Sequence, residues 1–136
     1  MKKIVLAFSG GLDTSFCVPY LIDKGFEVHT IFVNTGGISK NTEKQISNKS
    51  KKLGAKKHHS VNVETKLWQQ ILTPLIWSGS LYQGKYPVLC SDRYLIVSEA
   101  VNLCNKLKTN LIAHGCTGMG NDQVRFDMSI KALGNY

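Results

Sequence analysis

The sequence has no long apolar run. Its longest apolar stretches, such as residues 4–8 and 31–33, are the length of a β-strand, which excludes a membrane-spanning helix. The basic start of the chain is followed by only five apolar residues before Ser9-Gly10-Gly11, and no small-residue cleavage site follows. This pattern does not fit a signal peptide. We therefore expect a cytoplasmic protein with no membrane partner.

Arginine is scarce, and closely spaced cysteine pairs are lacking. The four cysteines form no C-x-x-C pair, which argues against a zinc or redox motif and favours reduced, mostly buried thiols. The chain has a net charge of +8 with only two arginines, and eight lysines lie between Lys40 and Lys66 against two glutamates. Such a basic strip could bind the phosphate backbone of a nucleic acid. Because it has no interleaved aromatic residues, a solvated helix face is the favoured interpretation and a nucleic-acid partner is disfavoured.

The remaining composition is that of one ordinary globular domain. A chain of 136 residues with 43% hydrophobic and 19% charged residues can bury its own core. Short apolar runs alternate with longer segments of helical periodicity, which indicates an α/β fold. Strands are predicted at residues 3–8, 27–34, 57–63 and 110–113, and helices at 12–24, 41–53, 92–107 and 121–133. We predict an open parallel sheet with helices on both faces and strand order 3-2-1-4.

Two further segments have weaker secondary-structure patterns. Residues 67–76 have a helical pattern that we expect to end at Pro74, and residues 78–87 contain enough breakers to predict irregular structure. The alternating pattern of residues 57–63 predicts a half-exposed edge strand.

The first glycine-rich turn follows the first strand and opens a helix. It reads Ser9-Gly10-Gly11-Leu12-Asp13-Thr14-Ser15. Free backbone N–H groups at a helix start favour an oxyanion, phosphate above all, and the three hydroxyls add donors. A carboxylate at Asp13 would repel that ligand unless a cation bridges them, which points to Mg²⁺. The alternative is that Asp13 and Thr14 are only helix N-cap groups.

A second glycine-rich loop follows the fourth strand and spans residues 113–126. Its glycines allow the backbone to approach a ligand, and Asn121 and Asp122 stand at a helix start. Arg125 lies one turn along, where it could clamp a carboxylate. The alternative is a plain turn in which Asn121 is an N-cap and Arg125 makes a surface ion pair.

These two loops carry a resemblance to known enzymes. The first resembles the pyrophosphate loop of the N-type ATP pyrophosphatases, and residues 113–126 closely resemble the segment by which argininosuccinate synthases hold ATP, aspartate and citrulline. The similarity runs from Ile4 to Leu133. It implies a HUP-type nucleotide-binding domain at residues 1–136, with ATP and Mg²⁺ as cofactors. On this resemblance we expect the chain to lack the larger C-terminal synthetase domain of the family.

The resemblance implies a role for each matching residue. The residues that would bind ATP are Ala7, Phe8, Ser9, Gly10, Gly11, Leu12, Asp13, Thr14, Ser15, Val33, Ala113, His114 and Gly115. Those that would bind aspartate are Thr117, Asn121 and Asp122, and those that would bind citrulline are Tyr86, Ser91, Asn121 and Arg125. In the implied reaction the ureido oxygen of citrulline attacks the α phosphorus of ATP, and the amine of aspartate then displaces AMP. No protein nucleophile, and so no catalytic residue of that kind, is implied.

The sequence also departs from the family pattern. Gly36-Gly37 replaces Gly-Gln, Met119 replaces a lysine, and the family's arginine falls one place later than Arg93. Two other readings stay open: a tRNA-thiolating ATP pyrophosphatase, for which the charge of +8 argues, and a non-catalytic nucleotide-binding fragment or subunit. Because a sheet that ends at its fourth strand leaves an edge unpaired, we expect a homo-oligomer or completion by a C-terminal partner.

Overall fold

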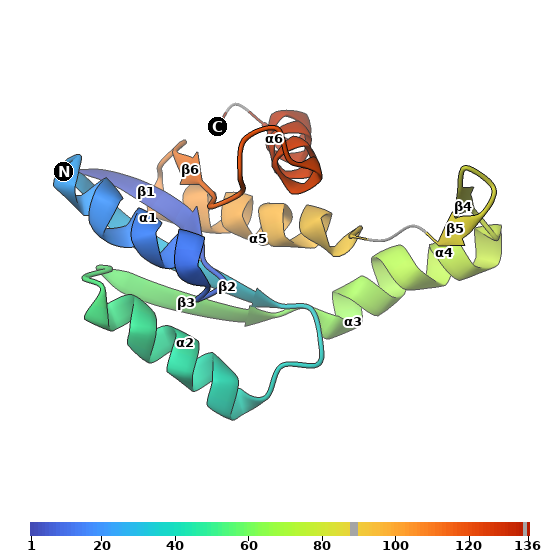
Figure 1. Cartoon of the computed structure of the whole chain (residues 1–136), viewed down its shortest axis with the longest axis horizontal. Coiled ribbons are helices and arrows are strands. Elements are labelled where there is room, and N and C mark those ends of the chain that lie inside the picture. Colours follow the sequence, from blue (N-terminus) through green and yellow to red (C-terminus); the bar gives the residue numbers. More distant parts are fainter. Residues whose placement is uncertain (88–89, 135) are drawn as a thin grey trace.

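A computed structural model describes residues 1–87, 90–134 and 136 of the chain. Its centre is a four-stranded parallel sheet in the order β3-β2-β1-β6 (Figure 1). The strands are β1 (Lys2–Ala7), β2 (Phe26–Asn34), β3 (Lys57–Asn62) and β6 (Ile112–Ala113). The predicted fold class and the order of the four sheet strands are confirmed, although β6 has only two residues.

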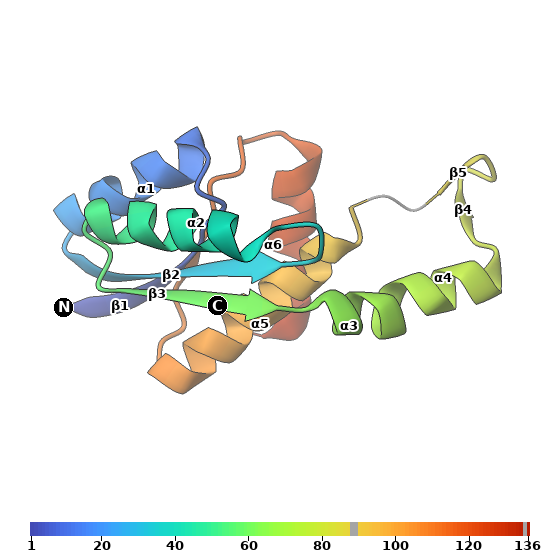
Figure 2. The same cartoon turned by 90° about the horizontal axis from the view of Figure 1, so that it is seen from below.

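Helices cover both faces of the sheet (Figures 1 and 2). On one face lie α1 (Leu12–Asp23) and α2 (Lys40–Lys52), and on the other lie α5 (Asp92–Leu107) and α6 (Asn121–Leu133). Alternate residues of β1 pack against the helices on opposite faces of the sheet: Leu6 packs with Val18 of α1, and Val5 packs with Leu95 of α5. Successive side chains of a strand point to opposite faces of the sheet. Because helices cover both faces here, successive buried positions are apolar and the sequence shows a continuous apolar run.

The predicted boundaries hold within two residues for most elements, and α5 and α6 begin and end where the sequence pattern placed them. Helix α2 begins after Ser39, whose hydroxyl accepts a hydrogen bond from the Thr42 N–H at 3.2 Å. Its lysines face solvent, as predicted for the basic strip. Strand β3 is an edge of the sheet and alternates between exposed and partly buried residues, which confirms the predicted half-exposed edge.

The segment after β3 differs from the prediction. The helix begins at Glu64 and passes Pro74 without ending there: α3 (Glu64–Leu67) leads into a π-helical segment, η1 (Trp68–Leu72), and then α4 (Thr73–Ser78). Because η1 resets the hydrogen-bond pattern, Pro74 falls in the first turn of α4, where proline removes no necessary donor.

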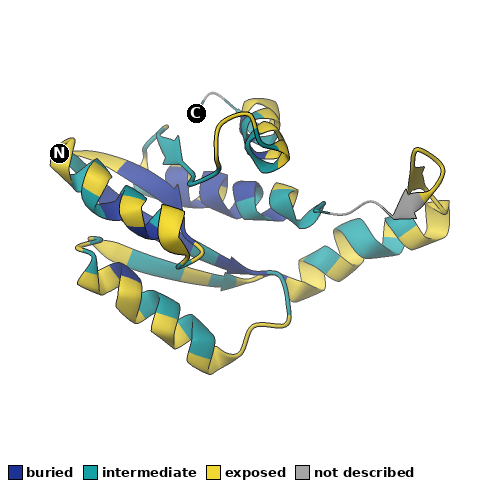
Figure 3. Cartoon of the chain, in the orientation of Figure 1, coloured by how far each residue is buried: buried dark blue, intermediate teal, exposed yellow. Residues whose placement is uncertain are grey.

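Residues 81–87 also differ from the expected irregular structure. They form a small antiparallel hairpin of β4 (Leu81–Tyr82) and β5 (Tyr86–Pro87). Together with α3, η1 and α4 it makes an arm that projects from the domain and is largely exposed (Figures 2 and 3). Among the described residues, no helix combines the length and the apolar character that a bilayer span requires.

Candidate functional site

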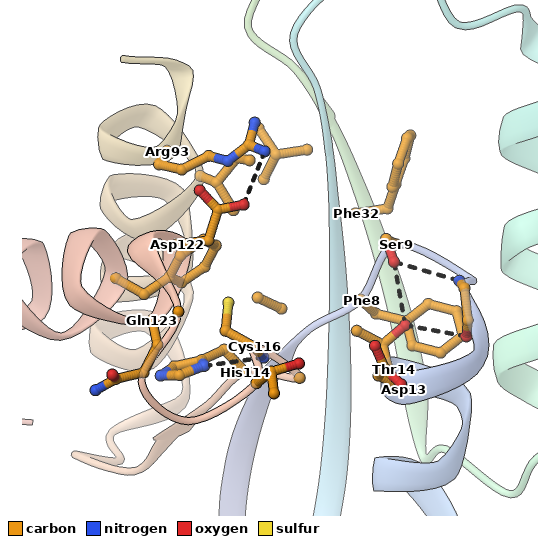
Figure 4. A pocket seen from close by; sticks show the side chains of 18 of the residues that line it. Phe8, Ser9, Asp13, Thr14, Phe32, Arg93, His114, Cys116, Asp122 and Gln123 are labelled. Atoms are coloured by element: carbon orange, nitrogen blue, oxygen red, sulfur yellow. Dashed lines mark hydrogen bonds and ion pairs between the residues drawn. The ribbon is translucent and has the colours of Figure 1, made fainter. Parts of the chain in front are cut away.

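A cavity of about 610 Å³ opens at the carboxyl ends of β1, β2 and β6. Its lining comes from the loop after β1, the end of β2, the first turns of α5 and α6, and the loop after β6. Figure 4 shows Ser9, Asp13 and Thr14 on one side of this space and His114, Cys116 and Asp122 on the other. In open parallel sheets this edge is where ligands bind, and the volume suits a small molecule.

The loop after β1 is organised by short hydrogen bonds. The Ser9 hydroxyl lies 3.2 Å from the Thr14 hydroxyl and accepts the Gly11 N–H at 3.2 Å. The Ser15 hydroxyl donates to the Gly11 carbonyl at 2.6 Å, so Ser15 closes the turn and does not face the cavity. Gly11 is the N-cap residue of α1 and no side chain caps this end, which leaves the first N–H groups of the helix open to a ligand. The alternative in which Asp13 or Thr14 caps α1 is therefore wrong.

The two glycine-rich loops are in direct contact. A Cβ atom built on Gly115 would lie 2.9 Å from Cγ2 of Thr14 and 3.1 Å from its backbone nitrogen. Both distances are shorter than ordinary van der Waals contact, so only glycine allows the second loop to approach the start of α1 this closely. Residues about one hundred positions apart thus come into contact, and both line the cavity.

Hydrogen bonds also fix the second loop. The backbone N–H of Cys116 donates to Nδ1 of His114 at 3.3 Å, and Nε2 of His114 is 3.0 Å from a carboxylate oxygen of Asp127. Since Nδ1 accepts, Nε2 carries the proton that Asp127 receives as a hydrogen bond. This bond and a second one from Gln123 lower the pKa of Asp127. His114 is therefore held in one orientation at the cavity wall.

Asp122 is held between two arginines. One carboxylate oxygen lies 3.1 Å from Nη2 of Arg93, and the other lies 2.9 Å from Nη1 of Arg125. These partners, Arg93 first, lower the pKa of Asp122, so its carboxylate is ionised at neutral pH. Figure 4 shows Arg93 and Asp122 beside each other on the same side of the cavity, joined by this interaction.

Most of the sequence-predicted ATP residues come together here. Those that line the cavity are Ala7, Phe8, Ser9, Gly11, Leu12, Asp13, Thr14, Val33, His114 and Gly115. Of the residues assigned to aspartate, Thr117, Asn121 and Asp122 also line it.

A smaller set of predicted residues does not line the cavity: Gly10, Ser15, Ser91, Ala113 and Arg125. The side chain of Tyr86 lies outside the described part of the structure. Gly120 is the N-cap residue of α6, so the alternative in which Asn121 caps this helix is wrong. The surface ion pair of Arg125, the other part of that alternative, is present.

Sequence reasoning missed several lining residues. They are Ile31, Phe32, Arg93, Ile96, Cys116, Gly120, Gln123 and Phe126. Cys116, Gly120, Gln123 and Phe126 lay within the quoted second loop, and Arg93 lay in the first turn of a predicted helix. Burial raises the pKa of the Cys116 thiol and nearby Asp122 raises it further, so this cysteine is not an activated nucleophile.

The described residues do not build a metal centre of their own, because none of them form a group of three or more His, Cys, Asp or Glu ligands. Asp13 is the carboxylate of the first loop that lines the cavity. One carboxylate beside a phosphate site fits the usual coordination of Mg²⁺, which keeps phosphate and water oxygens as its other ligands.

Comparison with known proteins identifies the family. The model of the arginosuccinate synthase N-terminal HUP domain matches residues 3–135. The chain belongs to this family. A curated argininosuccinate synthase from Xanthomonas axonopodis pv. citri is 54% identical over 99% of the chain, and one from Leuconostoc citreum is 39% identical over 97%. The chain spans about a third of the length of these relatives, 33% and 32% respectively.

Solved structures share the fold of the family. A predicted subunit of tRNA methyltransferase from Methanocaldococcus jannaschii superposes with a TM-score of 0.54 at 19% identity, covering 96% of this chain and 65% of that one. An NAD+ synthetase from Burkholderia pseudomallei gives a TM-score of 0.51 at 12% identity, covering 98% and 60%. At these identities the similarity concerns the fold alone.

Proposed function

We propose that residues 1–136 form the ATP-binding domain of an argininosuccinate synthase, which ligates citrulline to aspartate at the expense of ATP. The observation that carries this proposal is the contact between the two loops: Gly115 lies against Thr14, so both glycine-rich segments face one cavity. Neither loop alone would hold a nucleotide together with a second substrate.

The phosphate end of ATP would lie at the start of α1. The uncapped N–H groups there, the dipole of the helix and the hydroxyls of Ser9 and Thr14 together favour a polyanion. Asp13 would share Mg²⁺ with the phosphates, and the cation would supply charge neutralisation for the triphosphate. The apolar walls at Phe32 and Val33 suit the adenine ring.

The second loop would hold the substrate that reacts with the nucleotide. Thr117, Asn121 and Asp122 line the cavity and would orient aspartate. In the first step a bond forms between the ureido oxygen of citrulline and the α phosphorus, and pyrophosphate leaves. In the second the amine nitrogen of aspartate attacks the ureido carbon and AMP leaves. The protein would act mainly by alignment and charge neutralisation.

The citrulline side is the less complete half of the site. Ser91 and Arg125 stand outside the cavity lining, and Arg125 is paired with Asp122. Because the chain also spans only a third of its relatives, we propose that further residues from a C-terminal domain or partner complete the acceptor site. The second candidate follows from the same observations: a module that binds ATP and has no turnover by itself.

A tRNA-thiolating function has weaker support. Such chemistry needs a reactive sulfur, whereas burial and Asp122 keep the Cys116 thiol protonated. Filter binding of tRNA at two salt concentrations tests this alternative, since an RNA-binding protein must lose affinity steeply as salt rises.

The central experiment is exchange of labelled pyrophosphate into ATP, with and without citrulline, together with calorimetric titration of the chain with Mg-ATP. We expect ATP binding by the chain and exchange that depends on citrulline when the complete acceptor site is present. ATP binding without any exchange would favour the non-catalytic module. Failure to bind ATP would remove the proposal altogether.

Self-association is tested separately by sedimentation. Within residues 1–87, 90–134 and 136, the edge strand β6 has only two residues and no strand pairs with its outer edge. We propose that a second copy or a partner covers this edge, and a monodisperse monomer across a range of concentrations would contradict that.

A further inference from the structure

Helix α2 reaches the back of the phosphate loop. The ammonium group of Lys49 donates a 2.7 Å hydrogen bond to the carbonyl oxygen of Gly10, across 39 positions of sequence. Ile46, one turn earlier on the same helix, lies so close that a Cβ atom on Gly10 would be 3.2 Å from its Cγ1. The loop is therefore packed against α2 on the side away from the cavity, and neither Lys49 nor Gly10 lines the cavity.

The bonded carbonyl belongs to the same peptide unit as the N–H of Gly11. In a planar trans peptide the C=O and N–H groups point in opposite directions. Gly10 oxygen faces Lys49, so the Gly11 N–H faces the other way, where it meets the hydroxyl of Ser9 at the cavity wall. Fixing one end of this unit fixes the other.

This peptide unit needs such a restraint because a glycine stands on each side of it. Gly10 has φ +79°, a region open mainly to glycine, and Gly11 has φ −70° and ψ 179°. Glycines rotate about these angles with little steric resistance, so the unit could turn over. A reversed unit would aim a carbonyl oxygen at the phosphates and repel them electrostatically.

Helix α2 is itself firmly attached to the sheet. Ser50, the residue after Lys49, is fully buried, and its hydroxyl lies 2.6 Å from the hydroxyl of Thr30 on β2. Thr30 in turn lies 2.8 Å from Nδ1 of His58 on β3. This buried network places the backbone of Lys49 at a fixed distance from the loop.

We propose that Lys49 is a positioning residue, which keeps the Gly10 carbonyl turned away from the phosphates of the bound nucleotide and the Gly11 N–H turned toward Ser9 at the cavity wall. The inference rests on the proposed ATP binding. It also gives one member of the basic strip on α2 a specific task, which the other lysines of that helix do not share.

The test is calorimetric titration of the 136-residue chain and three variants with Mg-ATP and with adenosine. Lys49→Met removes the donor, Lys49→Arg keeps one, and Lys52→Met removes an equal charge from the same last turn of α2. Lys52 is exposed and has no hydrogen bond or ion pair to any residue that the structure describes. Thermal unfolding of each variant reports whether the fold is kept.

We expect Lys49→Met to weaken ATP binding at least fivefold while adenosine binding stays within twofold of the parent chain. Lys49→Arg should retain most of the ATP affinity, and Lys52→Met should bind ATP within twofold of the parent. A loss of equal size in both methionine variants would mean a general charge effect and would overturn the positioning role. An unchanged ATP affinity in Lys49→Met would overturn it as well.

The same titrations distinguish failure of the proposed ATP binding from failure of the positioning role of Lys49. If the parent chain binds neither ATP nor adenosine, the nucleotide site is absent and the inference falls with it. If the parent chain binds ATP and Lys49→Met loses ATP and adenosine to the same degree, the nucleotide site stands and the positioning role does not.

Discussion

The tight approach of Gly115 to Thr14 gives the sharpest prediction, the substitution Gly115→Ala. The added methyl would lie 2.9 Å from Cγ2 of Thr14, and the backbone nitrogen and Cα of Thr14 would be 3.1 and 3.3 Å away. Carbon atoms need about 3.5 Å, so the loops must separate by about 0.6 Å. Two of the three obstructing atoms belong to backbone, which cannot rotate away. We expect about 1–3 kcal/mol of lost stability from this overpacking.

The larger effect should fall on nucleotide binding. Moving the start of α1 lengthens hydrogen bonds to a charged ligand, and each such bond contributes about 1.5–3 kcal/mol. The expected result is a loss of ATP affinity of roughly tenfold or more. The assay is calorimetric titration with Mg-ATP, with thermal unfolding measured alongside to separate folding from binding.

The same loop offers a matched control. A Cβ atom on Gly118 would meet nothing within 4 Å, and this glycine does not have a positive φ angle. Gly118→Ala should therefore bind ATP like the parent chain. Adding Thr14→Ser to Gly115→Ala removes the 2.9 Å obstacle and should restore part of the affinity. Parent-like ATP affinity in Gly115→Ala, with an unchanged melting temperature, would refute the close contact between the loops.

Two further predictions concern the buried network beneath α2. Ser50→Ala removes the partner at 2.6 Å from Thr30 and should lower the free energy of unfolding by about 1–2 kcal/mol in urea titration; no change would mean that the hydroxyl is not bonded. Burial first, then His59 and Lys51, lowers the pKa of His58 to about 4. The unfolded chain, with a histidine pKa near 6.5, takes up the proton first, so stability should be complete above pH 6.5 and decline toward pH 4. Because the ring is partly exposed, we expect the free energy of unfolding to fall by only about 1–2 kcal/mol over this pH range. The His58→Gln variant should not show this loss. Equal dependence of stability on pH in both proteins would contradict the role of His58.

Much of the fold could be predicted because the relevant signals are local. The apolar run of β1 and the glycines after it mark a strand that feeds a helix. The periodic apolar positions of α5 gave both of its ends. Pro74 misled the same reasoning, because it follows a π-helical segment and falls in the first turn of α4, where a proline is tolerated.

The candidate site was likewise predictable from the sequence only in part. The first glycine-rich loop could be named because its residue types and spacing suit an anion at a helix start, whereas the roles of the second loop were implied by its resemblance to the family. Arg93 could not be assigned, since its role depends on Asp122, which lies 29 positions away on α6. The contact between Lys49 and the Gly10 carbonyl was equally invisible, because nothing in a lysine-rich helix marks one lysine as different.

The order of residues along the chain was enough to predict the alternation of strands and helices, the two glycine-rich loops and the family. Only in the folded chain do the loops touch at Gly115 and Thr14, does Asp122 lie between two arginines, and does Lys49 of α2 bond to the Gly10 carbonyl. The reason is the range of the interactions. Backbone preference and hydrophobic periodicity act over a few residues and are written in order along the chain, whereas steric fit and hydrogen bonds between distant segments exist only once the sheet has brought those segments together.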